Sequence, residues 1–429
     1  MRRLLRDPNA RWYLTGQAFS LLGDTSLWLA LGIWVKELTG SAAAAGLTFF
    51  FFSLSAVLSP VAGLVVDRVR RRPLLLWTNL ASGVMVLALF GVHGRGQVWL
   101  IYVVMFLYGL SYSFLGSAQS ALLKTMLPEE LLGDANGMLR TVREGLRLIA
   151  PLVGAALFAV VGGHVIAVID AVTFFIAAAS LLAVHVDETR AVVTGEALEA
   201  EAEHWWAEMT AGARHIWRTR VLRQIVIGTS IALLVVGFFE SLSFAIVQHG
   251  LHRAPTFLGV LLAVQGCGAH IGGPTAAPFM RRVGPGLLVG IGLAVMAASS
   301  ALLIPASMPI VFAGIALLGI SLPWVIVGIY TVLQVETPDD LQGRVYSAAD
   351  TVLSVPQTVS IGIGAGLVSI VDYRLLLVLI AAVLAVSALY LLTRREQRAR
   401  PQPAFVGVPG ADGDGADELV AGGTPSEVA

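Results

Sequence analysis

Long apolar stretches recur along this chain and constrain its fold more than any other feature. Each is about twenty residues or longer, the length that an α-helix needs to cross the hydrocarbon core of a bilayer. A membrane β-barrel would instead show strands of about 9–11 residues in strict alternation. Hydrophobic residues make up 56% of the chain and charged residues only 13%, whereas a soluble domain carries about 25% charged residues. The sequence therefore predicts an all-α membrane protein.

Twelve transmembrane helices are predicted from these stretches. They are expected at residues 12–35, 42–66, 73–92, 97–121, 137–161, 164–185, 221–248, 255–280, 285–305, 308–334, 346–371 and 373–392. We group them into an N-terminal six-helix bundle within 1–185 and a C-terminal six-helix bundle within 221–395. The cytoplasmic linker 186–220 contains a stretch, Glu199–Arg218, whose apolar residues at helical spacing predict an amphipathic helix on the membrane surface. The cytoplasmic tail 396–429 is expected to be disordered.

The basic residues predict the orientation of the chain. Loops on one side of the twelve spans hold only Lys36, Arg95, Arg253 and Arg374, and the other basic residues lie on the side of the termini or at helix ends facing it. Cytoplasmic loops carry the excess of Lys and Arg. Both termini are therefore predicted to be cytoplasmic, in a bacterial inner membrane. Because the first apolar stretch is too long for a signal peptide, it is interpreted as a retained span.

The sequence also repeats itself at a constant offset of 210 residues. Gly109-Leu-Ser111 recurs as Gly319-Ile-Ser321, Pro128-Glu-Glu-Leu-Leu-Gly133 as Pro338-Asp-Asp-Leu-Gln-Gly343, Gly154 as Gly364, and Gly63 before Arg71-Arg72 as Gly273 before Arg281-Arg282. The offset corresponds to six spans. This pattern is typical of two parallel six-helix halves related by an axis along the membrane normal, as in one large class of transporters.

A loop between the second and third spans resembles a known family. Gly63-Leu-Val-Val-Asp-Arg-Val-Arg-Arg-Arg72 is similar to the G-x-x-x-D-R-x-x-R-R loop of the major facilitator superfamily. The repeated P-E-E-L-x-G and P-D-D-L-x-G loops, with Gly23-Asp24 and Leu38-Thr-Gly-Ser41, resemble the branch of macrolide efflux proteins, the enterobactin exporter and the lysophospholipid transporter. The resemblance covers roughly Arg11–Thr393 and implies two pseudo-symmetric bundles that transport by alternating access, without a cofactor.

Two departures from the family pattern bear on mechanism. Many antiporters of the family carry a membrane-embedded Arg in the fourth span, but Trp99–Leu123 contains no basic residue. Their fifth span carries G-P-x-x-G-G, whereas this chain has Pro151 and Gly154 followed by Ala155. The usual scheme of proton coupling therefore does not transfer directly to this chain.

Two carboxylates are predicted to lie near the middle of the membrane. Asp24 is near the centre of the first span, and Glu240 is near the middle of the seventh, its repeat partner. An ionised carboxylate costs at least about 2.5 kcal/mol at the bilayer centre. Both residues are therefore candidates for proton coupling along a shared pathway. The alternative is that each is merely hydrogen-bonded to a neighbouring helix.

Other polar residues complete the candidate pathway. Its predicted lining consists of Tyr108, Tyr112 and Gln119 on the fourth span and Trp324 and Tyr330 on the tenth, although aromatic residues in spans also serve in packing. Asp170 is placed toward the outer face, where it is expected to pair with His164. His270 and Cys267 are interpreted as structural residues of the eighth span, with Cys267 a small core residue.

A cytoplasmic gate is predicted from the charged residues at span ends. By resemblance, Asp67 and Arg71, with Arg68 beside them, lock the gate in the outward-open state; the alternative for the arginines is that they only set topology. A second group, Arg140, Arg143, Glu144 and Arg147 at the start of the fifth span and Asp350 at the start of the eleventh, is expected to form either ion pairs between the halves or plain surface pairs.

Several function classes are disfavoured by what the sequence lacks. Neither Lys36 nor Lys124 follows a glycine as in a Walker loop, so no ATP-driven pump is predicted. No H-E-x-x-H pair or Cys/His cluster suggests an enzyme or a metal site, and a net charge of +0 gives no reason to expect nucleic acid. The favoured function is export of an amphipathic small molecule, such as a drug, macrolide or siderophore, in exchange for protons or another ion, by a monomer embedded in lipid. The alternatives are a lysophospholipid flippase and, more distantly, a non-transporting sensor.

Overall fold

The computed structural model describes residues 4–58, 66, 69–186 and 210–398, and within these ranges the regular structure is entirely helical. The N-terminal elements are η1 (Leu4–Arg6), α1 (Pro8–Thr39), α2 (Ala42–Leu54), η2 (Ser55–Leu58), α4 (Arg71–Leu87), η3 (Ala88–Gly91), η4 (Arg95–Gln97), α5 (Val98–Met126) and α6 (Glu129–Ala183). The later elements are α8 (Arg220–Val236), α9 (Phe239–Ala245), η5 (Ile246–Gly250), η6 (Pro255–Phe257), α10 (Leu258–Val283), α11 (Pro285–Leu302), α12 (Met308–Val335), η7 (Asp339–Leu341), α13 (Gln342–Leu367), α14 (Tyr373–Thr393) and η8 (Arg395–Gln397).

The predicted membrane-spanning architecture is confirmed. In the part of the chain that the structure describes, nine helices are long and apolar enough to cross a membrane. One of them, in α6, reverses direction at Gly162, whose φ of 74° lies in the left-handed region that favours glycine. This turn separates the fifth and sixth predicted spans. The shorter apolar helix α2 and the more polar α13 occupy the second and eleventh predicted spans, consistent with twelve crossings.

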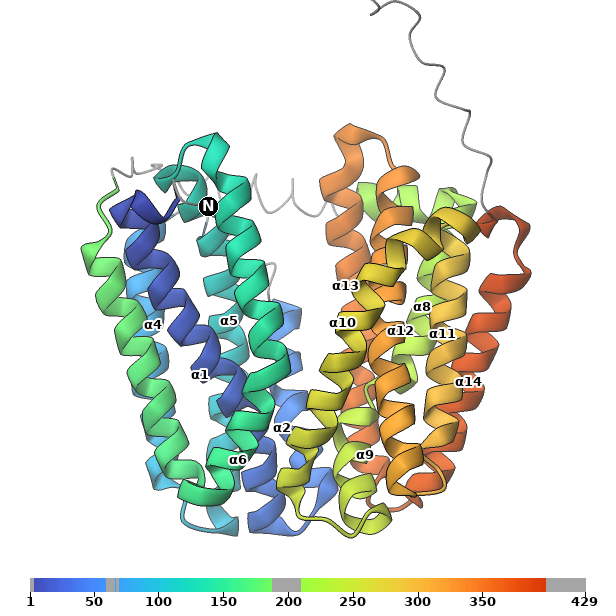
Figure 1. The fold of residues 1–429 in the computed structure, drawn as a ribbon, viewed down its shortest axis with the longest axis horizontal. Coiled ribbons are helices and arrows are strands. Elements are labelled where there is room, and N and C mark those ends of the chain that lie inside the picture. The colour runs from blue at the N-terminus through green and yellow to red at the C-terminus, as the bar shows by residue number, and fades with distance from the viewer. Residues whose placement is uncertain (1–3, 59–65, 67–68, 187–209, 399–429) are drawn as a thin grey trace, which may run out of the picture.

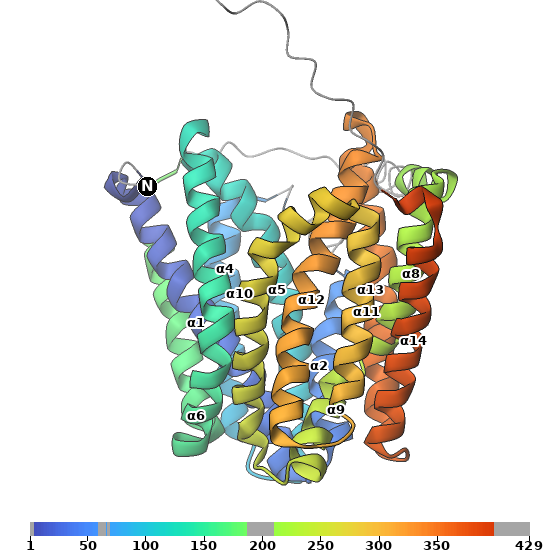
Figure 2. The same ribbon diagram turned by 45° about the vertical axis from the view of Figure 1, so that its right-hand side comes forward.

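The helices form two bundles that lean against each other. Helices α1 to α6 make one bundle and α8 to α14 the other, and the views in Figures 1 and 2 show the N-terminus and the end of α14 on the same side of the molecule. We call this side the terminal side and the opposite side the far side. The shared side agrees with the even number of predicted spans. Its location in the cytoplasm stays a prediction.

The sequence repeat is also a repeat of packing. A Cβ atom added at Gly109 of α5 would collide with Ser55 at the end of α2, and one added at Gly319 of α12 would collide with the backbone of Gln265 in α10. Both members of the first pair are related to those of the second by the offset of 210 residues. Glycine at both positions lets two helices approach closely, as is common in membrane bundles. The two halves are therefore built on one plan.

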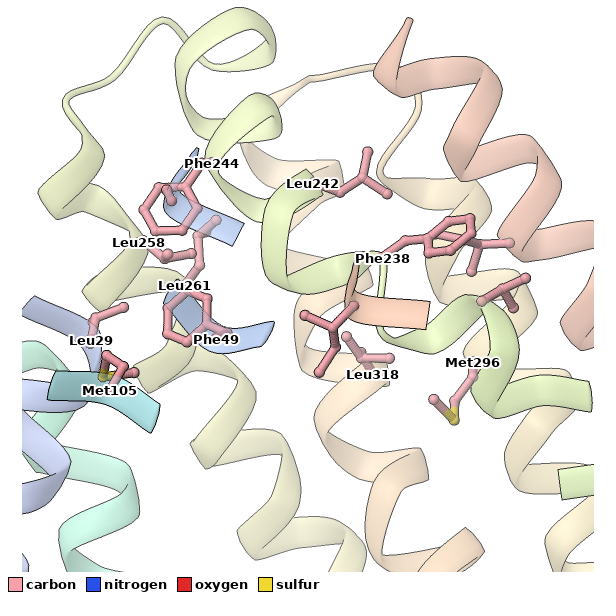
Figure 3. Close-up of a cluster of buried hydrophobic side chains, with 14 of the residues drawn as sticks. Leu29, Phe49, Met105, Phe238, Leu242, Phe244, Leu258, Leu261, Met296 and Leu318 are labelled. Atoms are coloured by element: carbon pink, nitrogen blue, oxygen red, sulfur yellow. The ribbon is translucent and has the colours of Figure 1, made fainter. Parts of the chain in front are cut away.

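Contacts between the bundles gather on the far side, in two seams. Helix α2 packs on α13 and α9, and α6 packs on α10. Gly362 of α13 lies against the ring of Phe50, and Gly259 of α10 lies against Pro151 and Ala155. Figure 3 shows the apolar part of this region, with Phe49 and Leu29 of the first bundle beside Phe244, Leu258 and Leu261 of the second. Every residue in this set lies in the far-side half of its predicted span.

The two bundles diverge toward the terminal side, as Figure 1 shows. The residues that make the seams all lie away from that side, so the structure is a conformation closed on the far side. If the termini are cytoplasmic as predicted, this is the inward-open state of an alternating-access cycle.

The linker lies mostly outside the described residues, as do the predicted positions of Trp205 and Met209 and the tail beyond Arg398. Residues 210–218 are helical, as predicted for the end of Glu199–Arg218. Gly212 lies against the backbone of Arg344, and the His215 ring bonds the Glu336 carbonyl. Ile216 is buried and Trp217 is 51% exposed. This segment therefore has the two unlike faces expected of an amphipathic helix, with one of them on the second bundle.

Candidate functional site

Asp24 is held between helices of the first bundle. The Tyr108 hydroxyl, on α5, donates a hydrogen bond of 2.6 Å to Asp24 Oδ1 on α1. Ser20, one turn earlier on α1, is close enough to interact with the same carboxyl group. An O–H···O distance in this range is typical of a bond to an ionised acceptor. Asp24 itself is half-buried. The predicted burial of Asp24 in its span is thus accompanied by two neighbouring hydroxyl groups.

Asp170, on the second half of α6, lies beside this pair. Its side chain is fully buried, and its carboxyl group is close enough to Asp24 and Tyr108 to interact with both. The Thr173 hydroxyl is 3.4 Å from Asp170 Oδ1, while Oδ2 has no hydrogen-bond partner among the described residues. The close approach depends on Gly23, where an added Cβ would collide with Asp170 and Thr173. Two carboxyl groups and a phenol therefore meet where α1, α5 and α6 pack.

The predicted pairing of Asp170 with His164 is wrong. His164 Nε2 bonds the Val92 carbonyl at 2.8 Å, and its ring packs edge-on against Trp34 at 4.8 Å. These contacts hold His164 at the far-side end of the bundle. Asp170 points instead into the bundle, toward α1 and α5. The prediction placed both residues toward the outer face, whereas the partners of Asp170 are on neighbouring helices.

The second bundle has no such polar group at the equivalent positions. The offset of 210 relates Asp24, Tyr108 and Asp170 to Leu234, Leu318 and Ile380. Two of the three equivalent pairs match in burial: Tyr108 is 5% exposed and Leu318 6%, and Asp170 and Ile380 are both 0% exposed, whereas Leu234 is 42% exposed and Asp24 is half-buried. The same site in the same fold is therefore aliphatic in one half and polar in the other.

Glu240 begins α9, just after a break in its span. The break follows Gly237, where the backbone of α13 approaches so closely that an added Cβ would meet Ile361 N and Gln357 O. One turn after Glu240, Phe244 reaches Gly32 and Phe49 of the first bundle. Residues four apart share a helix face. Glu240 is therefore on the face of α9 that is turned toward the first bundle.

The contact between Phe244 and Gly32 also gives the relative depths of Asp24 and Glu240 in the membrane. Asp24 lies about 12 Å from the level of Gly32, toward the terminal side, by the rise of an α-helix. Glu240 lies about 6 Å from the level of Phe244 in the same direction. Because Phe244 contacts Gly32, the two carboxylates differ in depth by roughly 6 Å. Their use of a shared pathway stays a prediction.

A cavity of ≈ 420 Å³ opens between the bundles, near the seam of α2 and α13. It is lined by Phe52, Ser53, Ser55, Ala56, Gly109, Tyr112, Ser113, Gly116, Ser117, Ser354, Gln357 and Thr358. Tyr112, a predicted pathway residue, is among them and packs its ring 6.1 Å from that of Phe52. Hydroxyl and amide groups dominate the polar part of this wall, which contains no charged side chain.

The other predicted lining residues have different surroundings. The Trp324 indole N–H donates to Thr275 Oγ1 at 3.0 Å, and its ring stacks on Phe279 at 5.2 Å. Trp324 therefore ties α12 to α10. The Tyr330 hydroxyl donates to Asp350 Oδ1 at 2.8 Å, and both residues are exposed. Gln119 is half-buried on α5 and does not line this cavity.

The predicted gate falls partly outside the described residues, because Asp67 and Arg68 are not among them. Arg71 begins α4, with a buried Nε that has no hydrogen-bond partner in the described part of the chain. Arg72 donates to the carbonyls of Leu181 and Leu182 at 2.9 and 3.0 Å, so it joins α4 to the end of α6. The role of Asp67 and Arg71 in gating stays a prediction.

The second predicted charge group lies on the terminal side. Arg140, Arg143 and Glu144 are exposed on α6, which also carries Arg147. Asp350, their predicted partner across the bundles, bonds Tyr330 in its own bundle. The bundles are apart on this side, so ion pairs between them would belong to the opposite conformation, and they stay a prediction.

The interpretation of Cys267 as a core residue is wrong, because its side chain is exposed on α10. His270, on the same helix, is also exposed and bonds the Gly266 carbonyl of its own helix at 2.9 Å. Among the described residues, no group of His, Cys, Asp and Glu side chains is placed to hold a metal ion.

Two pseudo-equivalent helical bundles with a cavity between them are the arrangement of a polytopic membrane transporter. The sequence profile described as Major Facilitator Superfamily matches residues 13–252 and 229–413. The chain belongs to this superfamily, as its loop motif indicated.

Curated relatives carry names that refer to efflux and drug resistance. Macrolide efflux protein A of Streptococcus pyogenes is 24% identical over 353 residues, which cover 81% of this chain and 86% of that protein. Multidrug resistance protein MdtG of Enterobacter lignolyticus is 26% identical over 406 residues, covering 91% of this chain and 92% of that protein.

Solved structures share the fold at low identity. A bacterial homologue of the iron transporter ferroportin in its inward-facing state has a TM-score of 0.69 at 15% identity, covering 89% of this chain and 97% of that one. The nucleoside transporter NupG has a TM-score of 0.70 at 12% identity, covering 90% and 99%. These likenesses support the architecture alone.

Proposed function

We propose that this protein exports an amphipathic small molecule in exchange for protons, by alternating access of the cavity between its bundles. The observation that carries the proposal is the Asp24–Tyr108 hydrogen bond, which places a titratable carboxyl group within the first bundle. In the described residues neither Asp24 nor Glu240 forms an ion pair with a basic side chain. Without a cation to hold them ionised, both carboxylates can exchange a proton during transport.

Proton binding and substrate binding are coupled through these two carboxylates. Proton uptake on the far side neutralises the site and releases the substrate there, and proton release on the terminal side resets it. The similar depths of Asp24 on α1 and Glu240 on α9 support their action on one pathway. The coupling needs only a few kcal/mol of difference between the two conformations.

The cavity supports a substrate with a hydrogen-bonding part and an apolar part. Its serine, threonine and glutamine side chains offer donors and acceptors, and Phe52 and Tyr112 offer aromatic surface. A wall without charged side chains favours recognition by hydrogen bonds and ring contacts rather than by ion pairs. Relatives named for macrolide efflux and multidrug resistance agree with such a substrate.

Transport by reconstituted protein tests the proposal. In proteoliposomes with an imposed pH gradient, the wild type should concentrate a macrolide or a comparable drug, while lysophospholipid serves as the competing substrate. Asp24→Asn and Glu240→Gln should each abolish uphill transport and leave downhill exchange partly intact. Asp339→Asn, which changes an exposed carboxylate, is the matched control. Uphill transport by the double neutral variant would show that these carboxylates are structural.

We also propose a bacterial inner-membrane location with cytoplasmic termini, on the basis of the Lys and Arg distribution. Single cysteines replacing Arg95 or Arg253 should be labelled from outside intact cells by a membrane-impermeant reagent. Cysteines replacing Arg71 or Ala411 should not. Labelling at position 411 in intact cells would overturn the topology.

A further inference from the structure

Asp170 has no part in the coupling scheme so far, although it is the most deeply buried carboxyl group beside Asp24. Its Oδ2 atom has no hydrogen-bond partner among the described residues, and its side chain is fully buried. An ionised carboxylate in this position would lack both solvent and donors, which is costly. A protonated Asp170 would instead carry a hydroxyl group that can donate.

The hydrogen bonds around Tyr108 indicate the acceptor to which a protonated Asp170 would donate. A phenol hydroxyl donates once and also accepts. Tyr108 donates to Asp24 Oδ1 at 2.6 Å, so the remaining capacity of its oxygen is to accept. The Asp170 carboxyl group lies beside the same hydroxyl. A proton on Asp170 therefore completes a chain that runs from Asp170 through Tyr108 to Asp24.

No cation on the surrounding helices replaces this proton. In the described part of the chain, four titratable groups on α6 and on elements packed against it are bound elsewhere: Lys36 of α1 bonds the Gly40 carbonyl, Arg72 of α4 bonds Leu181 and Leu182, His164 of α6 bonds Val92, and His270 of α10 bonds Gly266. Leu181, which Arg72 contacts, is about 16 Å along α6 from Asp170. The titratable groups that interact with Asp170 are Asp24 and Tyr108.

Packing does not explain Tyr108 and Asp170 either. The second bundle has the equally buried Leu318 and Ile380 at the equivalent positions. A polar group that an aliphatic one could replace in the same fold adds little to stability. Its presence in one half points to a role in transport.

We propose that Asp170 is a positioning residue of the coupling site, which stays protonated in the membrane and stabilises ionised Asp24 through the Tyr108 hydroxyl. The three side chains then bind and release one proton as a unit, alternating between one and two protons on the two carboxyl groups. The inference rests on the proposed function, in which Asp24 couples protons to transport.

Infrared spectroscopy of the purified protein tests where the proton is held. In a Glu240→Gln background at about pH 7, well above the ordinary carboxyl range near 4, the C=O stretching band of a protonated carboxyl group should persist. Asp170→Asn should remove that band, whereas Asp24→Asn and the surface control Asp339→Asn should leave it. A band that survives Asp170→Asn would overturn the assignment.

Transport separates positioning from mere packing. Asp170→Asn keeps a neutral donor and should retain uphill transport with a pH profile near that of the wild type. Asp170→Ile copies the second bundle and should move the profile by about one pH unit toward higher pH, because ionised Asp24 loses support worth about 1.4 kcal/mol. Equal profiles in the two variants would contradict the inference. Loss of proton-driven transport in the wild type would contradict the proposed function alone, since the infrared result does not depend on transport.

Discussion

The two bundles solve the same packing problem with different chemistry. Where α1, α5 and α6 meet, the first bundle has Asp24, Tyr108 and Asp170. At the equivalent positions the second bundle has Leu234, Leu318 and Ile380, of which the last two are as buried as their counterparts.

This difference separates what the fold requires from what transport requires. Helix packing in each half depends on shape: the small residues at Gly109 and Gly319 permit the same close contacts. Asp24, Tyr108 and Asp170 are polar residues that only the first bundle has at these positions. Internal repeats thus provide a control within one molecule, because each half shows what the other would be without its special residues.

The largest loss of stability is expected when a buried carboxyl group is introduced into the second bundle. Ile380→Asp would bury a carboxyl group whose equivalent partners are Leu234 and Leu318, which offer no donor. Burial of such a group without a hydrogen bond costs roughly 2–7 kcal/mol. Thermal unfolding of the purified variant in detergent should show a marked loss of stability.

The reciprocal variant, Asp170→Ile, should lose less stability than Ile380→Asp. It buries no unsatisfied polar group, and its larger side chain adds only overpacking against α1, which typically costs about 1–3 kcal/mol. If Asp170→Ile destabilised the protein as much as Ile380→Asp, Asp170 would be part of the structural core and the comparison between the halves would fail.

A smaller loss of stability, similar at both positions, is expected at the paired glycines. Gly109→Ala and Gly319→Ala each place a methyl group against the backbone of a neighbouring helix, at Phe52 O and Gln265 O. Such overpacking typically costs about 1–3 kcal/mol. Melting temperatures should fall to a similar extent in both variants. Gly137→Ala, with open space around it, is the control and should be neutral or stabilising by up to about 1 kcal/mol. If the melting temperature fell for only one of the paired glycines, the two halves would not share the same packing at these positions.

The smallest effect is expected at Tyr330. Its hydroxyl donates to Asp350 as that of Tyr108 does to Asp24, but both partners are exposed. Water replaces the lost bond, so Tyr330→Phe should cost no more than about 0.5–1.5 kcal/mol. Uphill transport should be nearly unchanged, as measured in proteoliposomes. A loss of coupling as complete as in Asp24→Asn would place the C-terminal pair in the coupling site as well.

The fold was predictable because its signals are local and repeated. Twelve apolar stretches, the constant offset and the loop at Gly63–Arg72 each required only the order of residues. The site was predictable only in part. The burial of Asp24 followed from its place in a span, whereas its contact with Asp170 depends on how α1 packs on α6, where Gly23 permits the approach.

The errors have physical causes. The order of residues places Asp170 and His164 in the same span but does not show which residues of neighbouring helices they contact. The apolar segment around Cys267 predicts a core residue. In a membrane an apolar side chain also faces outward without cost, so composition alone does not distinguish the inside of a bundle from its surface. The offset of 210 was available as a further signal, since it shows Ile380 in the place of Asp170.

The far-side seams offer a means of trapping this molecule for structure determination. Gly362 and Gly259 have room only for hydrogen where the bundles touch. A bulkier residue there would clash in the far-side-closed state and be harmless once the seam parts. Alanine at both positions would act as a wedge, one in each seam, that biases the population toward the conformation not yet seen. A crystallographer could thus obtain the form that is open on the far side with two methyl groups rather than with an inhibitor or an antibody fragment.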